Sequence, residues 1–197
     1  MRDFIVVLDP AHGEETPGKR SPDGKFREYL WSRMIIEKLS EKLDDAGFCV
    51  RETNTSKKEI GLSNRAGVCN MINGKKILIS IHSNAAGNGV EWKTATGFSV
   101  YTTKGKTKSD KVAEVLMNGF IKDFPELRAR MDMSDGDKDT EENFTVIKKA
   151  NCPAVLIEWM FQDNKNDVEV LLSEEYTNRL VDSIYNSIIE IENKKIV

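Results

Sequence analysis

Three short apolar runs, each followed by a histidine or an acid, constrain the fold of this chain more than any other feature. The runs and the residues that follow them are 4–8 with His12, 77–81 with His82, and 154–157 with Glu158. Continuous apolar runs of this length are typical of strands that are buried on both faces of a sheet. Open α/β sheets place their sites at the ends of strands, so we expect these three polar residues to share one site.

The rest of the chain alternates between helical and strand patterns. Apolar residues recur at helical spacing from about Glu28 to Ala46, and Gly47 is expected to end that helix. Further helices are expected over 63–72, 110–124, 166–172 and 174–191, and further strands over 48–53, 97–103 and, more briefly, 144–147. The polar stretch 125–143 is expected to be a loop. This alternation predicts an α/β fold with a mostly parallel central sheet.

The composition limits the classes of protein that need to be considered. A length of 197 residues suits one domain, so we expect a single domain over 1–197. The net charge of -3 gives no electrostatic basis for binding nucleic acid or an anionic membrane. No segment is long enough to span a bilayer, and the N-terminal apolar run is too short for a signal peptide. We also expect the chain to be a monomer.

The three cysteines, Cys49, Cys69 and Cys152, cannot all pair within the chain, and their spacing matches no zinc or redox motif. All three lie in apolar stretches of the sequence. We therefore expect small core residues rather than a disulfide framework.

His12, Glu28, His82 and Glu158 are the residue types of a mononuclear zinc site. Two imidazoles and one carboxylate leave one position of a four-coordinate zinc open for water, and a second carboxylate can act as a base. The residues by themselves leave another interpretation open. A histidine after a strand is commonly a hydrogen-bonded structural residue, and an acid in the first turn of a helix is commonly there for the helix dipole. No HExxH helix is present, so spacing alone does not identify the metal.

Residues next to these four refine the hypothesis. Glu158 follows four apolar residues, where a carboxylate is costly unless it has a partner or a task. Asp9 is expected to orient a metal ligand by accepting a hydrogen bond. Gly13 is expected to allow a sharp bend of the backbone beside His12.

Four segments resemble the motifs of the zinc-dependent N-acetylmuramoyl-L-alanine amidases (amidase type 3), a family of bacterial cell-wall amidases and phage lysins. The four segments are 6–13, Glu28 at the start of a helix, 79–85, and 153–158 followed by Phe161 and Asn164. Leu62 and Arg65 also fall where the family has a Leu-x-x-Arg helix. The sequence departs from the family at Ala11, where Gly is usual, and at Trp159 and Met160, where a small residue is usual.

The resemblance implies a phosphorylase/hydrolase-like α/β domain with a central sheet of about six strands flanked by helices. It implies one Zn²⁺ per chain, with His12, Glu28 and His82 as ligands and Glu158 as the catalytic carboxylate. The implied reaction is hydrolysis of the amide between N-acetylmuramic acid and L-alanine in peptidoglycan. The chain would act on the cell wall, either after release from the cytoplasm at lysis or as a remodelling enzyme.

Two further residues are candidates for binding the substrate. Arg20 lies in the loop between the first two ligands, together with Lys19 and Lys25, and could pair with a carboxylate of the stem peptide. Asn84 could donate a hydrogen bond to a substrate carbonyl, or it could fix its own turn.

Three alternatives remain open at the level of sequence. One is another mononuclear zinc peptidase, such as a carboxypeptidase, acting on cell-wall peptides. A second is a non-catalytic relative that binds peptidoglycan, and a third is a structural protein without a metal. The chain has only two histidines, which one mononuclear site would use completely.

Overall fold

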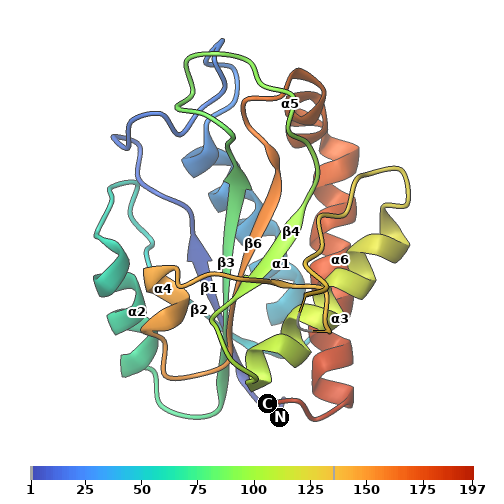
Figure 1. Cartoon of the computed structure of the whole chain (residues 1–197). Coiled ribbons are helices and arrows are strands. Elements are labelled where there is room, and N and C mark those ends of the chain that lie inside the picture. The colour runs from blue at the N-terminus through green and yellow to red at the C-terminus, as the bar shows by residue number, and fades with distance from the viewer. Residues whose placement is uncertain (1, 135) are drawn as a thin grey trace.

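The computed structural model describes residues 2–134 and 136–197, and a six-stranded sheet forms its centre (Figure 1). The strands lie in the order β2-β1-β3-β6-β4-β5, and neighbours are parallel except for β4 and β6, which are antiparallel. Their bounds are β1 Ile5–Pro10, β2 Cys49–Glu52, β3 Lys76–Asn84, β4 Ser99–Thr102, β5 Thr140–Glu141 and β6 Ala154–Phe161. The predicted α/β fold with a mostly parallel sheet is therefore confirmed.

Helices cover both faces of this sheet (Figure 1). Val6 and Leu8 of β1 pack in one cluster with α1, α3, α5 and α6, whereas Val7 packs in a second cluster with α2 and α4. Because both faces are covered, the central strands are largely apolar before their polar carboxyl ends, which made them recognisable as runs in the sequence. The helix bounds are α1 Glu28–Asp45, α2 Leu62–Met71, α3 Lys108–Asp123, α4 Thr145–Lys148, α5 Lys165–Leu172 and α6 Glu174–Asn193.

Side-chain caps begin α3, α5 and α6, whereas α1, which concerns the site, begins without one. Thr107 and Asp110 form a capping box at the start of α3. Gly47, with φ 83°, follows the end of α1, as predicted. The residue before α1, Arg27, provides no side-chain cap, and the first helical residue, Glu28, is fully buried. The first turn of α1 thus places a carboxylate inside the protein.

Two predictions about secondary structure were wrong. The run 144–147 was expected to be a strand, but α4 occupies most of it, and Val146 and Ile147 are both buried in the same cluster. Neighbouring residues of a strand point to opposite faces, so two adjacent core residues favour a helical turn. The stretch 125–143 was expected to be a loop, but it contributes β5 (Thr140–Glu141), which is too short to leave a pattern in the sequence.

The cysteines are in three different environments. Cys69 is buried, Cys152 is half-buried and Cys49 is exposed, so a core position was wrong for Cys49. The Sγ atoms of Cys69 and Cys152 lie 3.7 Å apart. None of the helices within the described ranges has the length and apolar character that a bilayer span requires.

Trp159 and Met160, which depart from the family pattern, are buried in the core. Met160 has φ 57° and lies where the register between β3 and β6 shifts. A positive φ is easiest for glycine, which explains why a small residue suits this position. Both side chains thus lie in the core, and Met160 does so with a backbone angle that glycine adopts more easily.

Replacing Trp159 with alanine is expected to lower the free energy of unfolding by about 3–5 kcal/mol. The indole is stacked on Phe98, with ring centroids 4.9 Å apart, and meets Phe120 and Phe124 edge to face. Denaturant unfolding of Trp159→Ala measures the loss. Trp92→Ala, which removes a half-buried indole, is the control and should cost less. Equal losses in the two variants would contradict the importance of the ring cluster.

Candidate metal centre

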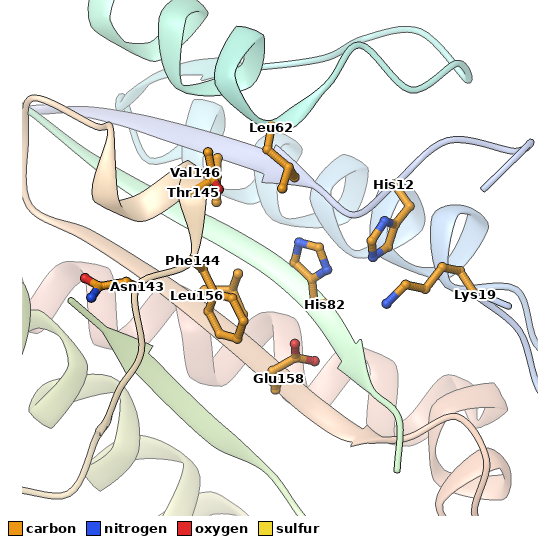
Figure 2. A pocket seen from close by; sticks show the side chains of 10 residues that line it. All are labelled: His12, Lys19, Leu62, His82, Asn143, Phe144, Thr145, Val146, Leu156 and Glu158. Atoms are coloured by element: carbon orange, nitrogen blue, oxygen red, sulfur yellow. The ribbon is translucent and has the colours of Figure 1, made fainter. Parts of the chain in front are cut away.

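The predicted metal ligands and the predicted catalytic carboxylate come together at the carboxyl ends of three adjacent strands, β1, β3 and β6; Figure 2 shows His12, His82 and Glu158 of this group. His12 follows β1, while His82 and Glu158 are register partners in β3 and β6. Glu28 comes from the first turn of α1. The fold thus joins four side chains that the sequence separates widely.

The ligand atoms of His12, Glu28 and His82 all lie within 4.8 Å of one another. Glu28 Oε1 is 3.0 Å from His82 Nδ1 and 3.6 Å from His12 Nε2. His12 Nε2 and Glu28 Oε2 are buried without a hydrogen-bond partner in the described part of the chain. Buried polar atoms normally have a hydrogen-bond partner, so the lone pairs of these two atoms are available to bind a metal ion. Two imidazoles and one carboxylate are a donor set that fits zinc.

The charge states of His12 and Glu28 suit metal binding, and the charge state of His82 depends on its contact with Glu28. Burial lowers the pKa of His12 to about 3, although the charge of Glu28 opposes this, so its ring is neutral at neutral pH. Burial by itself would lower the pKa of His82 and raise that of Glu28. Their mutual hydrogen bond and the opposite charges around them together outweigh burial, so the pKa of His82 is raised and the pKa of Glu28 is lowered. An ionised carboxylate and a neutral imidazole are the forms that bind metals, so His82 would release a proton on binding an ion.

Glu158 lies beside this set of three residues. Its Oε2 atom is buried and has no hydrogen-bond partner in the described residues. Burial raises the pKa of Glu158 to about 7; the charge of His82 opposes this shift and that of Glu28 adds to it. A buried carboxyl group in such surroundings is typical of residues that carry protons in catalysis.

A cavity of about 240 Å³ opens over these residues. Figure 2 shows the side chains of His12, Lys19, His82 and Glu158 at one end of the cavity. The side chains of residues 143–146, which lie in α4 and directly before it, are at the other end. The residues that line the cavity are His12, Lys19, Leu62, His82, Asn143, Phe144, Thr145, Val146, Leu156 and Glu158. The cavity therefore has a charged end at the candidate ligands and a more apolar end beside α4.

The two residues predicted to bind substrate do not line this cavity. Arg20 is exposed, and its backbone forms an isolated antiparallel β-bridge with Arg27. Asn84 Oδ1 accepts a hydrogen bond from the backbone N–H of Ala85 at 2.8 Å, so Asn84 fixes its own turn. The basic residue that the loop brings to the cavity is Lys19, whose Nζ lies 3.9 Å from Glu28 Oε2. A substrate contact by Arg20 or Asn84 stays a prediction.

Asp9 does not have the role that the sequence suggested. Its carboxylate accepts hydrogen bonds from the hydroxyls of Thr53 and Ser80 and lies 3.6 Å from Arg65 Nη1, rather than contacting a histidine. Arg65 is itself fully buried and also pairs with Glu59 at 2.7 Å. A buried carboxylate needs such partners, and here they fasten α2 to the strands beneath the site.

Sequence reasoning missed two consecutive residues of α1, Ser32 and Arg33. Arg33 donates hydrogen bonds to the carbonyls of Ala11 and His12, each at 3.1 Å. Ser32 Oγ accepts a hydrogen bond from the backbone N–H of Ala11 at 2.9 Å. The available signal was their spacing, because residues four and five positions after Glu28 lie on or next to the same side of a helix.

The turn that carries His12 is strained at the histidine itself. Among the described residues of this turn, the positive backbone angle is at His12 (φ 48°) and not at Ala11 or Gly13. Strained backbone of this kind is common at functional sites. Gly13 is required for another reason. A Cβ atom there would lie 2.2 Å from the backbone nitrogen of Glu59 and 2.8 Å from the carbonyl carbon of Lys58.

Gly13→Ala is therefore expected to lower the free energy of unfolding by about 1–3 kcal/mol, because backbone must move to admit the methyl group. The displacement also reaches the neighbouring His12, so zinc affinity should fall. Denaturant unfolding and zinc titration measure the two effects. Gly67→Ala is the matched control, since a Cβ at Gly67 meets open space, and it should be neutral or stabilising. Unchanged stability of Gly13→Ala would contradict the close approach.

Comparison with known proteins gives consistent results. Residues 6–190 match the family model Amidase_3, described as N-acetylmuramoyl-L-alanine amidase. The chain is 28% identical over 183 residues to the "Probable cell wall amidase LytH" of Staphylococcus saprophyticus, covering 92% of this chain and 56% of that protein. It is 28% identical over 172 residues to the "N-acetylmuramoyl-L-alanine amidase CwlM" of Bacillus licheniformis, covering 87% of this chain and 62% of that protein.

A solved structure agrees over the whole length. The N-acetylmuramoyl-L-alanine amidase from Clostridium difficile 630 superimposes with a TM-score of 0.86 and 27% identity, covering 99% of this chain and 100% of that one. The fold is thus that of the N-acetylmuramoyl-L-alanine amidase to which it is similar. The chain belongs to the N-acetylmuramoyl-L-alanine amidase family. It spans about 56% of the length of the first curated relatives that it matches.

Proposed function

We propose that this chain hydrolyses the amide bond between N-acetylmuramic acid and L-alanine in peptidoglycan, with one zinc ion as its cofactor. The observation that carries the proposal is the convergence of His12, Glu28 and His82 beside Glu158, with buried atoms that have no hydrogen-bond partner among the described residues. Membership of the amidase family supports the reaction, and the donor set supports the metal. The chain would act as a monomer on the cell wall.

Each residue of the site has a defined task in this reaction. A zinc ion held by His12, Glu28 and His82 would lower the pKa of water from about 15.7 to about 7 and polarise the substrate carbonyl. Glu158 takes a proton from the attacking water and then gives it to the amine of the departing L-alanine. Lys19 adds positive charge at the same end of the cavity, where the carbonyl oxygen becomes negative.

Digestion of purified peptidoglycan, followed by mass spectrometry of the products, tests the reaction. We expect intact stem peptides that begin with a free L-alanine amine. A carboxypeptidase would instead release single residues from the far end of a stem that stays attached to the sugar. Zinc-loaded protein that binds peptidoglycan without cleaving it would favour the non-catalytic alternative. Cleavage that survives complete removal of metal would overturn the role of zinc.

A further inference from the structure

We propose that Ser32 is a positioning residue that sets the separation of the two histidine-bearing backbone segments. The proposal rests on the zinc site proposed above. Ser32 is fully buried and lies four residues after Glu28, so it is one helical turn along the same side of α1. One helix thus carries a candidate ligand and, directly behind it, a hydroxyl group.

The hydroxyl of Ser32 joins the two chain segments that carry the histidines. It accepts a hydrogen bond from the backbone N–H of Ala11 at 2.9 Å and donates one to the carbonyl of Ile81 at 2.6 Å. The register of β1 with β3 ends at the pair Pro10 and Ile81. Beyond this pair, the N–H group of Ala11 donates its hydrogen bond to the side chain of Ser32 instead of to β3.

This arrangement has a direct consequence for the ligands. Ala11 and Ile81 immediately precede His12 and His82, so each bond of the Ser32 hydroxyl holds the residue next to a candidate ligand. The bonded atoms are buried, where a hydrogen bond fixes geometry and an unpaired N–H group is costly. Arg33 holds only the His12 segment, through two carbonyls, whereas Ser32 reaches both segments. Ser32 thus connects α1 to the backbone of both segments.

The test measures metal binding rather than activity alone. In Ser32→Ala we expect zinc affinity, measured by competition with a chelator, to fall by about 10–100-fold, as is typical when a partner behind a metal ligand is removed. The visible absorption of the Co²⁺-substituted protein, which reports ligand geometry, should change as well. Ser187→Ala is the matched control, because that buried serine bonds only a carbonyl of its own helix at 2.8 Å. It should keep the zinc affinity and the cobalt spectrum.

A second pair of variants separates the hydroxyl from the volume of the side chain. Ser32→Thr keeps the hydroxyl and Ser32→Val replaces it with a methyl group of similar size, so only the valine variant should lose affinity. Equal affinities in these two variants, or wild-type affinity and spectrum in Ser32→Ala, would overturn the role of Ser32. A wild-type chain that binds no zinc would overturn the proposed metal site and the role of Ser32 together.

Discussion

Glu158→Gln is expected to reduce turnover of peptidoglycan by about 10²–10⁴-fold while leaving zinc bound. Glutamine has nearly the same shape as glutamate, but its amide cannot take a proton from water or return one to the leaving amine. Glu158 is the register partner of His82, yet the candidate ligand set is formed by His12, Glu28 and His82. Activity and metal content should therefore separate in this variant.

Release of stem peptides and metal analysis of the same preparation measure the two quantities. Glu52→Gln is the matched control, because Glu52 is also an acid at the end of a parallel strand but does not line the cavity. It should retain wild-type turnover. Loss of zinc together with activity in Glu158→Gln would make Glu158 a ligand instead of the proton carrier. Wild-type turnover would remove it from the mechanism.

The strands that carry the site were predictable because their physical environment leaves a clear pattern. A strand covered on both faces must be apolar along its length, so β1, β3 and the first half of β6 appeared as continuous runs. His82 and Glu158 were visible because each interrupts such a run with a polar group. That His82 and Glu158 are register partners could not be predicted in this way, because it depends on the pairing of two strands that are distant in sequence.

Other features depend on contacts that no local pattern encodes. Gly13 was expected to provide conformational freedom, but the structure gives it a steric role against the backbone of residues 58–59. Asp9 was expected to orient a metal ligand, whereas its partners come from β3, α2 and the segment after β2. Ser32 appeared to be one more polar residue of a helix, and its importance depends on two backbone groups from separate strands. Tertiary proximity decides each of these roles.

Zinc is expected to raise the melting temperature of the wild-type chain and to have no such effect on His82→Ala. An ion that binds only the folded state at about 100 times its Kd adds about 2.7 kcal/mol of stability. For a chain of this size that corresponds to a rise of about 5–11 °C in Tm. His82 is buried and lies 3.0 Å from Glu28, so its removal takes one of three ligands from the centre of the site. Amidase activity should fall to background at the same time.

The melting experiment must distinguish zinc bound at the histidines from zinc bound at the thiols, because zinc also binds cysteine. Cys152→Ser is the control. The Sγ atoms of Cys69 and Cys152 lie 3.7 Å apart, so these two thiols could bind one zinc ion together. This variant should keep the full zinc-dependent rise in Tm. The sequence contains no histidine beyond His12 and His82 to take over the lost position. A full rise in His82→Ala combined with its loss in Cys152→Ser would place the ion at the thiols and exclude the histidines as its ligands.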